Sequence, residues 1–400
     1  VETRSVGDQE NQAFKERIVR LILPQVQTPG QYIGGELNAV VKARASVRGT
    51  LCLAFPDAYS IGMSCHGLHV LYRVMNQREA WACERAFAPG GDLERLLREQ
   101  GLPLFSLETF TPLAKFDVLG FTLQHELACT NVLTMLDLAG VPVSGTERTS
   151  EHPLVIAGGP CVANPEPMAR FVDLFVIGDG EEMLPRVCEE WLRLKQSGAD
   201  RASALAAMAQ LPHVYVPQCY EPEYVGGRFA ALHPKHAGLP ESVQPAVVAD
   251  LDAVPLPTAP VVPLVECVQD RIAIEIMRGC PWRCRFCQST TTKRPLRFRR
   301  VETIVNAALE TYQNTGYNEI SLLSLSTSDY PQFSELLARL QEVFRPMGVS
   351  VSVPSLRVNE QLRTIGDQPG TDRHSGLTLA PEAARDSLRQ RIGKQIDNED

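Results

Sequence analysis

Three cysteines carry the chemistry that this sequence predicts most directly. Cys280, Cys284 and Cys287 are separated by three and then two residues, and they follow the apolar run at 272–277. Cysteine thiolates hold iron–sulfur clusters, and four of them close a [4Fe–4S] cube. Three thiolates on one loop instead leave the fourth iron open to a second molecule. The spacing therefore predicts a [4Fe–4S] cluster with one open iron.

Two other uses of cysteine fit the sequence less well. A zinc site normally offers paired Cys or Cys/His elements, but no second pair lies downstream and the only later histidine is His374. A disulfide framework needs paired cysteines, whereas the chain has 11 of them scattered over 400 residues. We therefore expect reduced thiols and a cytoplasmic location.

Composition and charge limit the remaining possibilities. The chain is 44% hydrophobic and 22% charged, which is typical of a globular protein long enough for two domains. No apolar run approaches the ~18–20 residues of a membrane span, so we expect no membrane partner. The net charge of −8 argues against general nucleic-acid binding. Basic residues are concentrated at 271–300, and they could favour nucleic acid or an anionic substrate, or offset a bound anion.

Residues 46–200 alternate apolar strands with amphipathic helices after a mixed amino-terminal arm at 1–45. The expected strands are 51–55, 116–123, 153–157 and 172–177. This alternation indicates a Rossmann-like, doubly wound parallel sheet with both faces covered. Four glycines follow the last two strands, where such sheets bind ligands: Gly158, Gly159, Gly178 and Gly180.

The rest of the chain divides into a connector and a second α/β region. Residues 201–262 are predicted to form a connector with a β-hairpin that turns at Gly226-Gly227. From 263 to 400 the alternation of strands and helices resumes, with strands expected to end at Met277 and to span 319–325, 349–353 and 376–380. This pattern is typical of a (β/α) barrel, whose carboxyl-end loops carry the chemistry. A whole barrel needs more chain, so we expect a partial barrel, truncated at its carboxyl end.

The cysteine spacing, with Phe286 before the last cysteine, resembles the signature of the radical S-adenosylmethionine (SAM) enzymes. Further stretches resemble an uncharacterised family of radical SAM proteins with a B12 (cobalamin)-binding domain, often fused to further C-terminal domains. These stretches include 55–64 (FPDAYSIGMS), 158–167 (GGPCVANPEP), 177–182 (IGDGEE) and 380–382 (APE).

The resemblance implies a mechanism for the cysteine loop. Cys280, Cys284 and Cys287 would bind the [4Fe–4S] cluster, and SAM would chelate the open iron. One electron, supplied by a donor of the flavodoxin or ferredoxin type, would cleave SAM to methionine and a 5′-deoxyadenosyl radical. That radical would take a hydrogen atom from a substrate that the sequence does not identify.

The resemblance also implies candidate contacts to SAM. Each has a plainer alternative, such as core packing for the phenylalanine, helix capping near the hydroxyls or a solvated acid at a helix start for the glutamate. The candidates are Phe286, Ser326, Thr327, Arg357 and Glu382.

A cobalamin-type pocket in the amino-terminal domain is implied at the four glycines, Gly158, Gly159, Gly178 and Gly180. Many cobalamin domains use an Asp-x-His-x-x-Gly motif, which is absent here; His66, His69 and His125 lack that spacing. Bound cobalamin would point to methyl transfer or modification of a carbon skeleton. The alternative is a degenerate domain kept for substrate docking or dimerisation.

Two other functions stay open. Methylthiotransferase-like modification of tRNA or protein would need a second cluster in the amino-terminal domain, where cysteines occur outside any ligand motif: Cys52, Cys65, Cys83, Cys129 and Cys161. A non-catalytic iron–sulfur or nucleic-acid-binding adaptor would use the basic segment 293–300.

Overall fold

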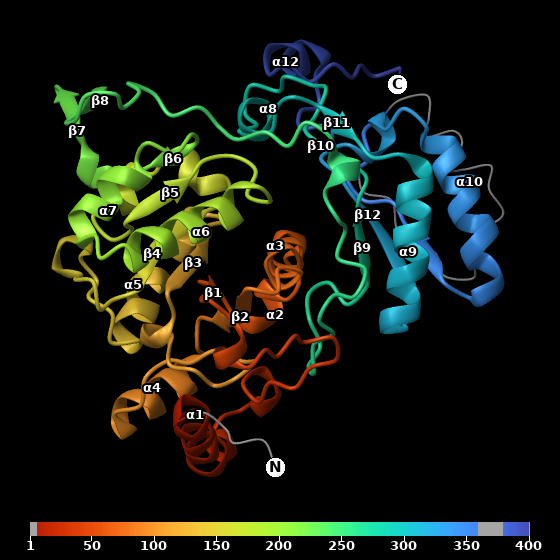
Figure 1. The fold of residues 1–400 in the computed structure, drawn as a ribbon. Coiled ribbons are helices and arrows are strands. Elements are labelled where there is room, and N and C mark those ends of the chain that lie inside the picture. The colour runs from red at the N-terminus through yellow and green to blue at the C-terminus, as the bar shows by residue number, and fades with distance from the viewer. Residues whose placement is uncertain (1–5, 359–378, 400) are drawn as a thin grey trace. The chain divides into compact units, whose positions relative to one another are not determined.

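The computed structural model describes residues 6–358 and 379–399. The chain folds into two compact units (Figure 1). The first, which we call the sheet unit, is Val1–Val247 with Val261–Val268. The second, the cysteine unit, is Val248–Pro260 with Gln269–Asp400. The two short segments between 248 and 268 thus belong to opposite units.

The sheet unit is built on six strands in the order β2-β1-β3-β4-β5-β6. The first five strands are parallel and β6 runs antiparallel to β5. This arrangement confirms the predicted α/β class with a parallel sheet. The strands are β1 (Gly49–Phe55), β2 (Trp81–Phe87), β3 (Val118–Thr122), β4 (Leu154–Gly158), β5 (Leu174–Val176) and β6 (Val214–Tyr215).

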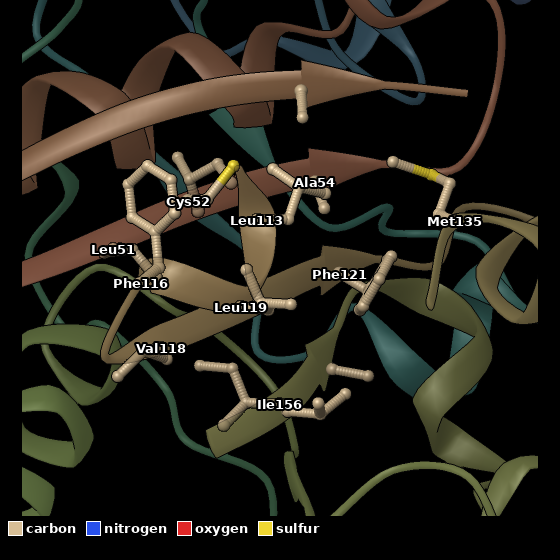
Figure 2. Close-up of a cluster of buried hydrophobic side chains, with 14 of the residues drawn as sticks. Leu51, Cys52, Ala54, Leu113, Phe116, Val118, Leu119, Phe121, Met135 and Ile156 are labelled. Carbon is tan, nitrogen blue, oxygen red and sulfur yellow. The ribbon is translucent and has the colours of Figure 1, made fainter. Parts of the chain in front are cut away.

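Helices and loops bury the strands of the sheet unit. Every residue of β1 and β3 is buried, which matches the continuous apolar runs of strands covered on both faces. Figure 2 shows part of this core, to which Leu51, Leu119 and Ile156 of neighbouring strands contribute. The helices are α1 (Val6–Arg17), α2 (Tyr59–Gly62), α3 (His66–Asn76), α4 (Gly91–Gln100), α5 (Cys129–Leu138), α6 (Met183–Gln196) and α7 (Arg201–Met208).

The predicted domain boundaries need two corrections. The arm at 1–45 is not separate, because Ile18, Ile22 and Tyr32 are buried in the core of the sheet unit. The connector at 201–262 is not separate either, because α7 and β6 extend the sheet unit and 248–260 belong to the cysteine unit. The expected hairpin is present as β7 (Tyr220–Val225) and β8 (Arg228–Pro234). Its turn places Gly226 and Gly227 at φ +59° and +77°, as two-residue hairpin turns require.

The cysteine unit contains a parallel sheet of order β13-β12-β9. Its strands are β9 (Ile272–Glu275), β12 (Glu319–Leu323) and β13 (Ser350–Ser352), and two helices, α9 (Val301–Thr315) and α10 (Phe333–Phe344), connect them. Ile304 and Ala308 of α9 and Leu336 and Leu340 of α10 are buried in the core of this unit. The unit therefore contains two β/α steps of a parallel sheet, and their continuation into a barrel stays a prediction.

Shorter elements complete the cysteine unit: β10 (Met277–Arg278), α8 (Ser289–Thr292), β11 (Arg297–Phe298) and α12 (Asp386–Arg391). The strand expected at 376–380 lies largely outside the described residues; within them, Leu379 forms a parallel bridge with Leu356. Across the described segments, no helix combines the length and apolarity that a membrane crossing requires.

Candidate functional site

The cysteine loop, residues 279–296, is held closed at its base. Met277 and Arg278 of β10 pair antiparallel with Phe298 and Arg297 of β11. Gly279 then opens the loop at φ +99°, and a Cβ atom there would lie 2.5 Å from the Lys293 carbonyl oxygen. Only glycine avoids both the strained backbone and this collision. The backbone at the entrance of the cysteine loop, after β9, is therefore fixed in one conformation.

The three cysteines of the loop lie within electrostatic reach of one another. Cys284 is buried, whereas Cys280 and Cys287 are partly buried, and the Cys287 amide donates to the Cys284 carbonyl at 3.1 Å. Burial raises the pKa of the Cys280 thiol, and the charges of Asp329, Cys284 and Cys287 raise it further. The loop thus carries all three thiols, and their binding of a cluster stays a prediction.

The chemistry of the donor set fits a [4Fe–4S] cube, which takes a cysteine thiolate at each of its irons. Over residues 6–358 and 379–399, no three or more His, Cys, Asp or Glu side chains form a group that could hold a metal ion. The loop supplies three cysteine thiols, which are ligands of the kind that such a cube takes.

Trp282, between the first two cysteines, contacts two other loops. Its Nε1 donates to Asp329 Oδ2 at 2.5 Å, and the Arg357 Cζ lies 3.6 Å from the centre of its ring. Asp329 follows β12 and Arg357 follows β13, so the carboxyl ends of all three strands contribute to this region. Carboxyl-end loops are where (β/α) barrels place their functional groups.

The hydroxyls predicted to contact SAM are buried and engaged inside the protein. Ser326 Oγ donates to Asp329 Oδ2 at 2.6 Å, and Thr327 Oγ1 donates to the Pro354 carbonyl oxygen at 2.6 Å. Both side chains therefore support the loops beside Trp282. What each retains for a ligand is its capacity to accept a hydrogen bond.

The other predicted contacts differ widely in exposure. Phe286 is 54% exposed, so core packing does not account for this aromatic residue. Glu382 is exposed, has a positive φ of 67° and forms an ion pair with Lys394 at 3.3 Å. Arg357 is only 6% exposed. Their roles toward SAM stay predictions.

Two of the four glycines predicted to form a cobalamin-type pocket have a structural explanation. Gly159 and Gly178 have φ values of +106° and +96°, and a Cβ atom would lie 2.6 Å from the Leu123 carbonyl and 2.3 Å from the Ala246 carbonyl, respectively. Close backbone approach therefore requires these glycines, whatever binds nearby. The other two, Gly158 and Gly180, have more room, since the nearest atoms to such a Cβ lie at 3.9 and 3.3 Å.

Sequence reasoning missed a pair of side chains at the carboxyl edge of the sheet. Asp57 follows β1 and His125 follows β3, and Asp57 Oδ2 lies 3.4 Å from His125 Nε2. The two side chains are 21% and 46% exposed. The strand order reverses between β1 and β3, which is where open α/β sheets bind ligands. The sequence did contain a signal for this pair, because Asp57 and His125 each come directly after a strand. These two strands are neighbours in the sheet.

The structure gives less support to the two alternative functions, which are methylthiolation and a non-catalytic iron–sulfur or nucleic-acid-binding adaptor. Cys52 and Cys83 are buried in β1 and β2, where burial raises their pKa values well above the usual range. In the basic segment, Arg294 donates to the Thr290 carbonyl at 2.6 Å, Arg297 to that of Val248 at 2.6 Å and Arg299 to that of Val254 at 3.1 Å. These arginines hold together the fold of the cysteine unit.

A parallel sheet unit, followed by β/α steps with a three-cysteine loop after the first strand, defines the architecture of a two-part radical SAM protein. Residues 67–217 match the family described as radical SAM proteins, N-terminal, and residues 274–400 match the radical SAM superfamily. Two radical SAM family models thus match the chain one after the other.

Known relatives extend beyond this chain. An uncharacterized protein of Methanocaldococcus jannaschii is 25% identical over 361 residues, a match that covers 88% of this chain and 64% of the relative. The radical SAM methyltransferase TsrM from Kitasatospora setae, solved with cobalamin and a [4Fe–4S] cluster bound, has a similar fold, with a TM-score of 0.53 at 14% identity. That match covers 88% of this chain and 63% of TsrM. TsrM with tryptophan substrate and aza-SAM gives a TM-score of 0.52.

Proposed function

We propose that this enzyme binds a [4Fe–4S] cluster through Cys280, Cys284 and Cys287 and uses it to cleave SAM reductively. The observation that supports this most is the closed loop that presents the three thiols after β9. An electron donor of the flavodoxin or ferredoxin class and an unidentified substrate complete the reaction, which we place in the cytoplasm.

When bound, the cluster would supply the electron that divides SAM into methionine and a 5′-deoxyadenosyl radical. The protein has to hold three irons, orient SAM and exclude water. The thiols of the cysteine loop meet the first need. Phe286 offers an exposed aromatic face to the adenine, and Ser326 and Thr327 offer acceptor oxygens to the methionyl amine.

Anaerobic reconstitution tests this proposal. The wild-type protein should take up about four irons per chain and, with dithionite and SAM, should release 5′-deoxyadenosine. Cys284→Ala should do neither, while Cys219→Ala, which removes a thiol of the sheet unit, should behave like the wild type. Iron uptake without any 5′-deoxyadenosine would favour the adaptor function. About eight irons would favour methylthiolation.

A second proposal concerns cobalamin, bound at the carboxyl edge of the sheet unit for methyl transfer or carbon-skeleton modification. It is supported by the reversal of strand order between β1 and β3 and by the exposed Asp57–His125 pair at that point. The similar fold of TsrM, a methyltransferase solved with cobalamin, points the same way.

Titration with hydroxocobalamin tests the cofactor separately from the cluster. The visible spectrum should shift, and the pigment should stay with the protein on gel filtration. His125→Ala should weaken retention, whereas His152→Ala, which removes a partly exposed ring bonded to Thr149, should not. An unshifted spectrum with no retained pigment would remove cobalamin and leave the degenerate domain.

A further inference from the structure

Trp282 is fixed from two directions although it lies on a loop. Its Nε1 donates to Asp329 Oδ2 at 2.5 Å, and one face of its ring is covered by the Arg357 guanidinium at 3.6 Å. Its carbonyl oxygen also accepts from Arg294 Nη2 at 3.1 Å. Because Trp282 lies between Cys280 and Cys284, these contacts restrain the backbone that joins two of the three thiols.

Arg357 is itself held rigidly. Ser328 Oγ lies 3.0 Å from both its backbone nitrogen and its carbonyl oxygen, and its Nη2 donates to the Gln395 carbonyl at 2.8 Å. The side chain is nearly buried, and its Nε is buried without a hydrogen-bond partner in the described part of the chain. A buried cation is costly unless it is compensated, and stacking on an indole face recovers part of that cost.

The segment after α12 contacts the same region. The Arg285 amide donates to the Ile392 carbonyl at 2.8 Å. A Cβ atom on Gly393 would lie 2.8 Å from the Arg283 carbonyl oxygen, so this glycine packs directly against the cysteine loop. Through Gln395, the segment also fixes Arg357. The cysteine loop is therefore held in place by the segments that follow β12 and β13 and by the chain beyond residue 390.

We propose that Trp282, Asp329 and Arg357 form a clasp that fixes the backbone between Cys280 and Cys284 and thereby determines how firmly the cluster is held. In this clasp Arg357 is a positioning residue that acts through Trp282. The inference rests on the proposed function, since it concerns the cluster that the cysteines would bind.

The geometry separates this role from direct binding of SAM. Pairing with a carboxylate in a fork uses two parallel N–H groups along one edge of the guanidinium. In Arg357, one N–H of Nη2 is already committed to Gln395, which takes the edge to which it belongs, and the face of the group lies on Trp282. These two contacts serve the clasp, whereas a SAM carboxylate would have to pair with the other edge.

The experiment compares iron retention in reconstituted full-length protein and its variants. Arg357→Leu should accelerate iron release to a chelator about tenfold, the effect of losing a desolvated cation–π contact, and Trp282→Leu should accelerate it at least as much because it also loses the bond to Asp329. The double variant should release iron no faster than Trp282→Leu, because both changes remove one interaction. Arg345→Leu, an exposed arginine of the same unit, serves as the control and should match the wild type.

Two conservative variants keep the test informative if the leucine variants fold poorly. Trp282→Phe retains the ring face and loses only the bond to Asp329, so its iron release should lie between that of Trp282→Leu and the wild type. Arg357→Lys keeps the charge but cannot lie flat on the ring while donating to Gln395. It should therefore resemble Arg357→Leu.

Spectroscopy of the reduced cluster distinguishes the outcomes. Once loaded, Arg357→Leu should still show the change in its electron paramagnetic resonance spectrum that SAM binding causes in the wild type. Wild-type iron release combined with loss of that change would overturn the inference and make Arg357 a SAM ligand. Fully additive effects in the double variant would also overturn it. A wild-type protein that takes up no iron would instead refute the proposed function.

Discussion

The two units of this protein use their buried arginines differently. In the sheet unit the buried arginines pair with carboxylates that are themselves buried, and Arg148 and Arg201 also donate to backbone carbonyls. Arg85 lies between Glu36 and Glu108, at 3.2 and 2.6 Å, and all three side chains are almost completely buried. A second buried group has the inverse composition, with one acid, Asp173, between Arg148 and Arg201, at 3.0 and 2.6 Å.

In the cysteine unit the buried arginines also donate to backbone carbonyls, but the carboxylates paired with Arg299 and Arg389 are 15% and 40% exposed. Arg297 donates to Val248 at 2.6 Å, Arg357 to Gln395 at 2.8 Å and Arg389 to Ile396 at 2.8 Å. Each of these bonds ties down a segment that has no regular secondary structure.

The difference reflects what each unit has to stabilise. The strands of a sheet satisfy one another's backbone hydrogen bonds. The buried charges of the sheet unit therefore serve to attach covering loops to strands. The cysteine loop makes backbone hydrogen bonds of its own, such as that of the Thr290 amide to the Cys287 carbonyl, and arginine, with five donors, can satisfy further carbonyls. The guanidiniums also bring positive charge to a unit whose proposed cluster, with three thiolates, is anionic. Four changes test this comparison.

The largest effect is expected from Arg85→Leu. It leaves Glu36 and Glu108 buried without their counter-charge, which should lower the free energy of unfolding of the sheet unit by about 3–5 kcal/mol. Urea unfolding followed by circular dichroism measures it. Arg95→Leu, which removes an exposed pair with Glu99 on α4, should cost at most about 0.5 kcal/mol. Similar losses in both variants would contradict the comparison.

Glu84, beside Arg85 on β2, predicts a dependence of stability on pH. Burial, and after it the charge of Glu108, raise its pKa from 4.5 to about 7. Because the folded pKa is the higher one, the stabilisation is complete below about pH 4.5 and is lost as the pH rises through about 7.

Glu84→Gln should therefore be more stable than the wild type above pH 7, by up to about 3 kcal/mol. The advantage should disappear near pH 4.5, where the wild-type carboxyl is protonated in both states. Thermal or urea unfolding across this pH range provides the measurement, with the exposed Glu99→Gln as control. A stability difference that does not change with pH would exclude the buried carboxyl as its cause.

Gly279→Ala should act on the cysteine unit alone. A non-glycine residue at this positive φ costs about 1–3 kcal/mol, and the new Cβ would collide with the Lys293 carbonyl. We expect faster iron release with unchanged unfolding of the sheet unit. Gly91→Ala, on a helix with open space around it, should be neutral or slightly stabilising. Iron release at the wild-type rate would show that the loop tolerates a shift of the backbone at its entrance.

The smallest effect is expected from Arg300→Ala. Arg300 pairs with Asp252 at 2.6 Å, as short as the pair of Arg85 with Glu108, but its side chain is 79% exposed. Its removal should cost about 0–1 kcal/mol, and less at high salt. A loss comparable to that of Arg85→Leu would mean that distance, not burial, determines these energies.

Periodicity predicted most of the strands and failed where charge interrupted it. The expected strands at 51–55, 116–123, 153–157 and 172–177 correspond to β1, β3, β4 and β5. β2 was missed because its sequence contains Glu84 and Arg85, which look like surface residues. Their partners, among them Ser106 and Glu108, come from a distant loop, and no local pattern reveals such pairing.

The sequence by itself determined the class of chemistry, because three cysteines at this spacing lie on one short segment and need no distant partner to be recognised. Only the tertiary structure decided that Trp282 meets Asp329 and Arg357, and that Asp57 meets His125. These residues come together because parallel strands bring their carboxyl ends to one edge. Strand order and register set that arrangement, and both depend on packing across the whole unit, which local spacing does not encode.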